Sequence, residues 1–480
     1  MHQSRQAARS AAKIVVVLVL VVIPLLLGDR IVAGLILGLL GVALLGFAAT
    51  RFRADPTIAV ILFLVCGLFV SPLGFAKPVD LFFAFALGAS IVVHRYKKRM
   101  FGDDRASRLF VYVMCALYAA SGLYSTVTHL GALNDIYQDL RPGLYLLVLP
   151  LCLNFCRADM RRWENVLRVT VALFSAISIA QFVAGVGFIG AVGDVETLGN
   201  VTEGITRVTS PANYFVCLFL FVALSRWLST GRISIADLAI SAAGVVCLTI
   251  SFGRGFWYTA ILGFGIIVLL ARGKGRLRSL VLIVLVAGAL AGVLQTFASS
   301  AFVGTLMDRF TSAGKEVDHG DSLGWRDQED FYAIKALADS SPRYFLGAGV
   351  PYKPVLIDMD LFANQQIYIH NTYLGLLLKV GPIGLAAVLI YFGVLLRRIL
   401  FLLKSREYRW IARAFLAGFI QFVATSVTQP AFIVATSSVV YFCFLAAGIS
   451  VVFRMRRDDR LRRKAEFNLR PDSFQAVLVR

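Results

Sequence analysis

The chain has 480 residues, of which 58% are hydrophobic and 16% are charged, whereas a soluble domain carries about a quarter charged residues. Its formal net charge of +20 comes from basic residues that cluster in short segments between long apolar blocks. Such clustering is typical of membrane topology and argues against nucleic-acid binding. The apolar blocks are long enough to read as membrane spans, which excludes a soluble fold.

We predict an all-α polytopic membrane protein with about fourteen transmembrane helices. The expected spans are 12–27, 31–49, 57–72, 79–94, 109–128, 144–156, 166–187, 212–228, 235–251, 256–271, 279–298, 372–396, 411–428 and 432–453. The first apolar run has no small-residue cleavage site after it, so we interpret it as an uncleaved span. No cytoplasmic segment is long enough to fold alone, and residues 1–480 are therefore one polytopic membrane domain.

Lys and Arg concentrate in every second loop. Because cytoplasmic loops are enriched in these residues, this alternation predicts that both termini are cytoplasmic, with residues 454–480 forming a basic cytoplasmic tail. The opposite, periplasmic face then carries one exceptionally long loop, residues 299–369, between helices 11 and 12. Its aromatic residues and a predicted helix from about Gly324 to Ala338 favour a folded cap over the active site. The alternative is a flexible loop.

Four arginines lie at membrane edges on this outer face, against the usual charge bias: Arg141, Arg207, Arg254 and Arg326. A guanidinium group can hold two phosphate oxygens at once, so the four predict a shared anionic ligand. The alternative is that each pairs with local acids or lipid headgroups.

His370 lies where the long loop re-enters the membrane at the twelfth span. At about 100° per residue, Gly381 and Gly384 return to the helix face of His370, and Lys379 falls on the opposite face. A glycine-lined face allows close packing that would hold the histidine rigidly. Histidine at such a position can accept a proton near neutral pH; the alternative is a hydrogen-bonded structural residue.

Four short motifs occur in order over roughly residues 200–390. They are Arg-x-x-x-Pro-x-Asn at 207–213, Ser-Phe-Gly-Arg-Gly at 251–255, Gly-Trp-Arg at 324–326 with Ser-Pro-Arg-Tyr-Phe-Leu-Gly-Ala-Gly at 341–349, and His-Asn followed by Gly-Pro-Ile-Gly within 370–384. Together they resemble the O-antigen ligase and O-antigen (exopolysaccharide) polymerase superfamily of bacterial membrane glycosyltransferases. The chain departs from that family by a Phe-Gly insertion after Ser251 and by Lys379, where the family often has an acidic residue.

The resemblance implies a GT-C-like helical fold in the bacterial inner membrane and a metal-independent, inverting glycosyltransferase without cofactors. The donor would be a glycan on undecaprenyl pyrophosphate. Arg207, Arg254 and Arg326, with Arg141, would bind the pyrophosphate, which takes over the charge neutralisation of a metal. His370 would orient or deprotonate the acceptor hydroxyl, supported by Asn371, Gly381 and Gly384.

Several alternatives stay open at the level of sequence. The acceptor is either lipid A–core, as for a ligase, or the next lipid-linked repeat unit, as for a polysaccharide polymerase. A lipid-linked glycan flippase or other transporter is a different class, disfavoured because ionisable residues are scarce within the spans. The Asp-x-Asp at 358–360 could hold a divalent cation, although solvated loop acids are the favoured interpretation.

Overall fold

The structure is a computed structural model that describes residues 104–128, 130, 133–155, 160–184, 191–194, 206–209, 212–279, 281, 322–338, 347–350, 355–357, 363–366, 369–432 and 436–468. The four predicted spans before residue 104 lie outside these residues, as does nearly all of the span at 279–298. The predicted count of about fourteen therefore stays a prediction.

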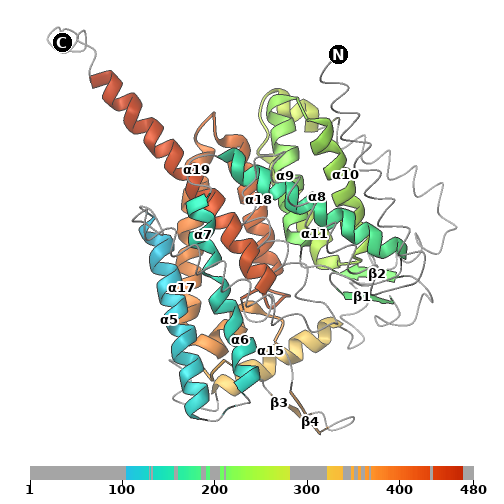
Figure 1. The fold of residues 1–480 in the computed structure, drawn as a ribbon, viewed down its shortest axis with the longest axis vertical. Coiled ribbons are helices and arrows are strands. Elements are labelled where there is room, and N and C mark those ends of the chain that lie inside the picture. The colour runs from blue at the N-terminus through green and yellow to red at the C-terminus, as the bar shows by residue number, and fades with distance from the viewer. Residues whose placement is uncertain are drawn as a thin grey trace.

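The described chain is mostly helical (Figure 1). Its helices are α5 (Arg105–Val127), α6 (Leu133–Tyr145), α7 (Val148–Phe155), α8 (Met160–Ala184), α9 (Asn213–Thr230), α10 (Ile235–Ile250), α11 (Arg254–Leu269), α15 (Ser322–Ala338), α17 (Thr372–Leu403), α18 (Arg409–Thr425) and α19 (Thr436–Asn468). Two short antiparallel hairpins were not predicted: β1 (Ala191–Asp194) with β2 (Thr206–Thr209), and β3 (Val355–Ile357) with β4 (Ala363–Gln366). Strands of three or four residues are too short to show an alternating pattern.

Five described helices are long and apolar enough to cross a membrane: α5, α8, α9, α17 and α19. Helices α10 and α11 are shorter and apolar. All of them coincide with predicted spans, and the chain is a helical membrane protein.

The predicted sixth span, 144–156, is not one continuous helix. The structure has two helices there, and the first begins at Leu133. The chain turns between them, where the Leu146 N–H donates to Gly143 O at 3.3 Å and the Leu147 N–H donates to Leu144 O at 3.1 Å. Such three-residue bonds tighten and end an α-helix.

Helices α9 and α19 form the centre of the bundle. Helix α9 and the first half of α19 are apolar around most of their circumference, and a helix of this kind lies either inside a protein core or within a membrane. The Tyr214 ring of α9 stacks on the Tyr441 ring of α19 with centroids 5.0 Å apart, and Phe422 of α18 stacks on Phe442 at 5.2 Å. By contrast α5 and α17 expose large apolar side chains along one face, which is typical of helices that face lipid.

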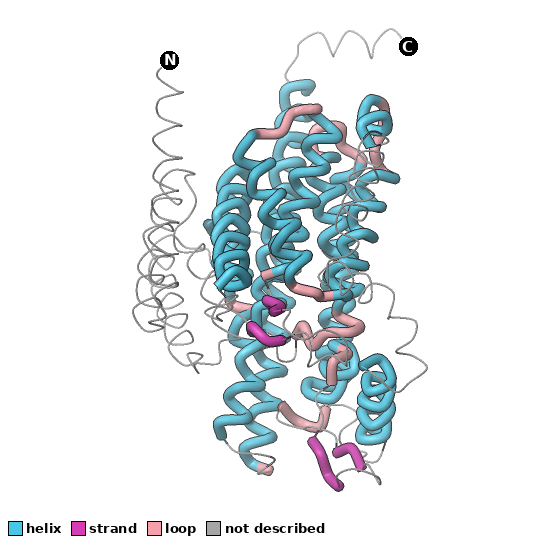
Figure 2. The backbone as a smooth tube through the Cα atoms, turned by 90° about the vertical axis from the view of Figure 1, so that its right-hand side faces the viewer, coloured by secondary structure: helices cyan, strands magenta, loops and turns pink. Residues whose placement is uncertain are grey.

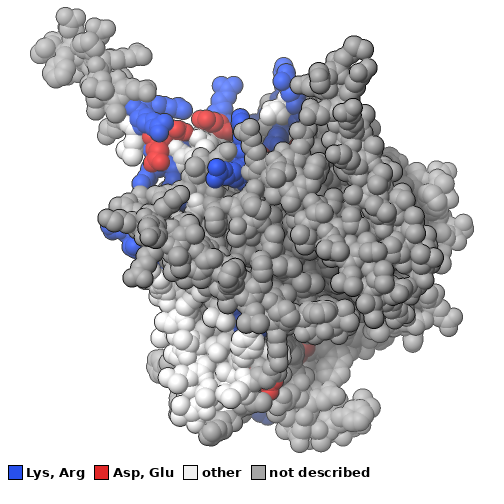
Figure 3. All heavy atoms as spheres, viewed as in Figure 1, with Lys and Arg blue, Asp and Glu red and all other residues white. Residues whose placement is uncertain are grey.

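The two ends of the bundle differ in charge. On the face shown in Figure 3, the described Lys and Arg side chains gather at one end, called here the basic end. Helix α15 and the β3–β4 hairpin lie at the other end, called here the loop end (Figures 1 and 2). At the basic end Asp104 accepts from both terminal nitrogens of Arg398, at 2.7 and 2.8 Å. Burial alone would raise the pKa of Asp104, but its bonds to Arg398 lower it to about 2.

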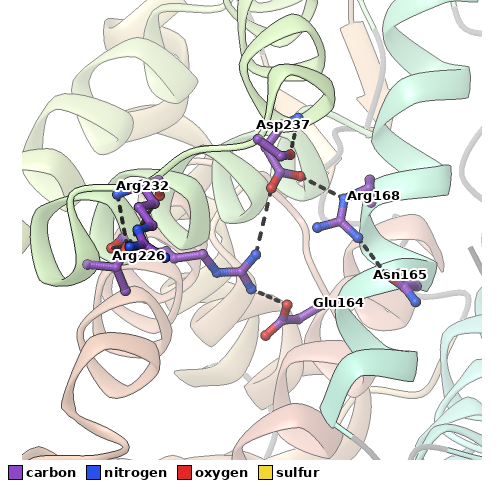
Figure 4. A network of polar contacts seen from close by, with 8 residues as sticks. Glu164, Asn165, Arg168, Arg226, Arg232 and Asp237 are labelled. Atoms are coloured by element: carbon purple, nitrogen blue, oxygen red, sulfur yellow. Dashed lines mark hydrogen bonds and ion pairs between the residues drawn. The ribbon is translucent and has the colours of Figure 1, made fainter. Parts of the chain in front are cut away.

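A polar network at the basic end joins α8, α9 and α10 (Figure 4). Arg226 of α9 reaches between Glu164 of α8 and Asp237 of α10. Arg168 approaches Asp237 from α8, with its Nε 2.7 Å from Oδ1. The charges of this cluster are thus mutually compensated, and it fastens three helix ends together.

Helix α17 breaks within its first third. Gly381 has φ 71° and ψ −178°, outside the helical region, and Pro382 follows it. Proline has no N–H to donate and its ring crowds the carbonyl four residues earlier, so Leu378 O loses its helical partner. The Ala348 N–H donates to Leu378 O at 2.5 Å, and the Ser121 hydroxyl of α5 donates to Lys379 O at 2.6 Å. Both donors come from other parts of the chain.

The segment 347–350 of the long loop fills this break. Gly347 has φ 76° and Gly349 has φ 105°, both in the region that favours glycine. A Cβ on Gly347 would lie 2.5 Å from Leu378 O and 2.8 Å from Gly381 N. The Val350 N–H donates to Ser125 Oγ at 3.1 Å. Residues 347–350 of the long loop are therefore anchored within the bundle.

Gly347→Ala should destabilise the protein by roughly 1–3 kcal/mol, because alanine is strained at this φ and its methyl group overlaps the α17 backbone. Thermal unfolding in detergent measures the effect. Gly393→Ala, in the same helix α17, is the matched control, since nothing lies within 4 Å of its Cβ position. Equal melting temperatures for the two variants would contradict this account of the break.

Candidate functional site

His370 stands at the start of α17 and contacts the long loop. Its Nδ1 lies 2.8 Å from Oε2 and 3.1 Å from Oε1 of Glu329, which belongs to α15. The His370 backbone N–H donates to Oε2 of the same carboxylate at 3.1 Å. The histidine side chain is 40% exposed, against 10% for Glu329. One edge of the ring is therefore held by a carboxylate, while part of the ring stays accessible.

Asn371 caps the helix that follows. Its Oδ1 accepts from the N–H groups of Tyr373 at 3.1 Å and Leu374 at 3.4 Å, two donors that a helix start leaves without partners. Its Nδ2 donates to Oδ2 of Asp330 at 3.1 Å. Consecutive carboxylates of α15, Glu329 and Asp330, thus bind consecutive residues at the start of α17.

The start of α17 is also fixed to the turn after α18. The Thr372 N–H donates to Ser426 O at 2.9 Å, and its hydroxyl donates to Gln429 O. The Ala431 N–H donates back to the Thr372 hydroxyl at 2.6 Å. His370 therefore lies close to Thr372, which three hydrogen bonds fix to this turn.

Gln429 connects this turn to the starts of two further helices. Its Oε1 accepts from the Tyr214 hydroxyl of α9 at 3.1 Å. Its Nε2 lies 4.0 Å from the position that a Cβ on Gly255 would occupy, next to Arg254. Gln429 therefore lies near the starts of α9, α11 and α17, with its side chain bonded to Tyr214 and its backbone carbonyl bonded to Thr372.

Arg254 is the first residue of α11, and Gly253 is its N-cap. The Phe-Gly insertion forms the turn before it: Phe252 has φ 47°, unusual for a residue other than glycine, and is buried. The Ser251 hydroxyl accepts from the Gly253 N–H at 3.3 Å. Arg254 thus lies at a helix N-terminus, where backbone N–H groups and the helix dipole favour anions.

The structure describes the other three predicted arginines in different detail. Arg326 is half-buried on α15, three residues before Glu329, so the two share a helix face. Arg207 lies on β2 opposite Gly193 of β1, a few residues before the start of α9, and its side chain lies outside the described part. Arg141 lies within α6 and is 5% exposed.

A buried ion pair lies near the break in α17. The Lys379 Nζ is 2.5 Å from Oδ2 of Asp139 in α6, and both side chains are 7% exposed. Lys379 therefore has its acidic partner on another helix, two residues from Arg141.

The prediction that Gly381 and Gly384 lie on the helix face of His370 needs correction. It assumed an unbroken helix, and the break at Gly381 ends the regular 100° spacing. The close approach at Gly381 is made by Gly347 of the loop. At Gly384 a Cβ would meet Val380 Cγ2 at 2.4 Å, so this glycine leaves room for the kinked chain itself.

The sequence did not identify Glu329, Asp330, Asp139 or Gln429. The helix over 324–338 was predicted and is confirmed as α15, but four polar residues in a row, Asp-Gln-Glu-Asp at 327–330, offered no reason to choose one of them. Within the described residues no group of three or more His, Cys, Asp or Glu could hold a metal ion. The Asp-x-Asp at 358–360 lies outside those residues.

Comparison with known proteins adds no assignment. No protein-family model matches the chain, and no curated protein shows a significant match to it.

Neutralising one member of the Asp139–Lys379 pair should destabilise the fold, because the other charge is left buried without its partner. We expect Asp139→Asn and Lys379→Met each to cost about 3–5 kcal/mol. The double variant should cost clearly less than the two single losses together. The free energy of unfolding in detergent measures all three, and additive losses would show that the two charges are not coupled.

Proposed function

We propose that this protein is a metal-independent, inverting membrane glycosyltransferase. It moves a glycan from undecaprenyl pyrophosphate to the hydroxyl of an acceptor sugar. One observation carries the proposal: His370, a partly exposed proton acceptor, is held by a carboxylate on α15, one helical turn from Arg326. The helix start that bears Arg254 is linked to the same region through Gln429.

The chemistry divides between these groups. The acceptor oxygen attacks the anomeric carbon of the donor, and the bond from that carbon to the pyrophosphate oxygen breaks. The hydroxyl proton passes to the ring nitrogen of His370 that faces away from Glu329. The undecaprenyl pyrophosphate leaves with the bonding electrons, and Arg207, Arg254 and Arg326 bind its negative charge. Arg141 adds positive charge from its buried position in α6.

Two acceptors are compatible with this site. As an O-antigen ligase the protein would use lipid A–core, and as a polysaccharide polymerase it would use the next lipid-linked repeat unit. A deletion strain separates them: single repeats accumulate on the lipid carrier if a polymerase is lost, and long chains accumulate there if a ligase is lost.

A flippase or other transporter remains the second candidate, because α17 is a broken helix with a buried ion pair beside the break. Transporters commonly place ions and substrates at such positions. Here, however, Lys379 and Asp139 bind one another, and the loop segment 347–350 occupies the break. Both features favour a structural role for the break and an enzyme at the loop end.

The proposal places the site on the periplasmic face of the bacterial inner membrane, with both termini in the cytoplasm. We expect a cysteine at Lys335, exposed on α15, to be labelled by an impermeant thiol reagent in intact spheroplasts, in a background without the native cysteines. A cysteine at Arg463, 74% exposed on α19, should be labelled only after lysis. The reverse pattern would place the site on the cytoplasmic face and contradict the proposed donor.

His370→Ala should still bind the donor while the chemical step falls by a factor on the order of 10² to 10⁴, the usual contribution of a positioned acid–base group. Arg254→Lys and Arg326→Lys should weaken donor binding as well, because lysine cannot hold two phosphate oxygens in a fixed geometry. A non-reactive donor analogue measures binding, and turnover is measured per folded molecule.

The contrast between these variants tests the division of roles. Normal turnover of folded His370→Ala would remove His370 from the chemistry. Full activity in both lysine variants would make the two arginines structural.

A further inference from the structure

Glu329 has no part in the reaction as proposed, yet it is the side chain that the structure places against the ring of His370. Both carboxylate oxygens lie within hydrogen-bond distance of Nδ1, and Oε2 also accepts from the His370 N–H. The carboxylate is mostly buried, at 10% exposure. This bidentate contact fixes both the backbone and the ring of one residue.

An ionised carboxylate accepts hydrogen bonds and cannot donate them. A neutral histidine ring beside it must therefore carry its proton on Nδ1, which leaves the lone pair on Nε2. Only that tautomer presents a proton acceptor on the edge of the ring that faces away from Glu329. The orientation and the tautomer of the base thus depend on a residue of α15.

Helix α15 is docked by more than this pair. Ala333 and Leu337, one and two turns beyond Glu329, pack with Ile369 and Leu378 beside the start of α17. Figure 1 shows α15 running crosswise to the helices of the bundle at the loop end. Arg326 lies one turn before Glu329 on the same helix. A displacement of α15 would therefore move the arginine and the carboxylate together.

We propose that Glu329 is a positioning residue that sets the Nδ1–H tautomer of His370, so that His370 acts as a base only while α15 is docked on the start of α17. The catalytic role of His370 rests on the proposed function; the tautomer does not. Arg326, which binds the donor, and Glu329, which aligns the base, then lie on the same helix.

Glu329→Gln tests the proposal with little change in shape. The amide carries no charge and places an NH₂ donor where one of the two oxygens faced Nδ1, so the Nδ1–H tautomer is no longer enforced and the Nε2–H tautomer gains population. Turnover should fall by about 10²- to 10⁴-fold, as when a carboxylate that orients a catalytic histidine becomes an amide. Affinity for a non-reactive donor analogue should stay unchanged, since the arginines are intact.

The matched control is Asp135→Asn, which removes one exposed carboxylate near the start of α6 at the same end of the bundle and should leave turnover unchanged. Nitrogen NMR of ¹⁵N-histidine protein, assigned with His370→Gln, reports the tautomer directly at a pH where the ring is neutral. We expect Nδ1–H in the wild type and a larger share of Nε2–H in Glu329→Gln.

Two results would overturn the proposal: wild-type turnover in folded Glu329→Gln, or an Nε2–H ring in the wild-type protein. The second measurement needs no variant at position 329, so it decides the matter even if Glu329→Gln does not fold. Failure of the proposed function would give different results. The wild type would transfer no glycan, or His370→Ala would transfer it normally, while the wild-type tautomer would still be Nδ1–H.

Discussion

The break in α17 is the constraint to which the rest of the described structure adapts. A lipid environment offers no hydrogen bonds, so the carbonyls freed before Pro382 must be satisfied by protein. Ala348 and Ser121 supply the donors, which brings the long loop into the bundle and fixes it against α5. The part of α17 before the break is thereby held in place, and His370 lies directly before its N-cap residue, Asn371.

Buried charges are likewise satisfied by partners within the protein. Lys379 and Asp139 neutralise one another where neither could remain ionised alone without a large cost. At the basic end Asp104 is paired with Arg398, and Arg226 bridges two acids. His370 and Glu329 form the corresponding pair at the loop end, but there the histidine stays 40% exposed.

The structure brings some of the predicted site residues close together and leaves the roles of all of them as predictions. His370, Asn371 and the arginine-bearing starts of α11 and α15 were predicted from short motifs, and the structure links the first two to α15 and, through Gln429, to the start of α11. Glycine roles were misassigned, because spacing along an ideal helix cannot represent a helix that breaks. The conformation of Gly381 depends on Pro382 together with the donors that reach it from Ala348 and Ser121.

The sequence by itself determined that this is a helical membrane protein, because apolar runs of sufficient length have no other stable arrangement in a bilayer. It also determined the helix over 324–338 and the helix start just after His370, since local sequence patterns predict both. Only the tertiary structure decided that Glu329 contacts His370 and that Asp139 pairs with Lys379. These partners lie 41 and 240 residues apart in the chain, and a contact at that separation is set by how the helices pack, which no local pattern encodes.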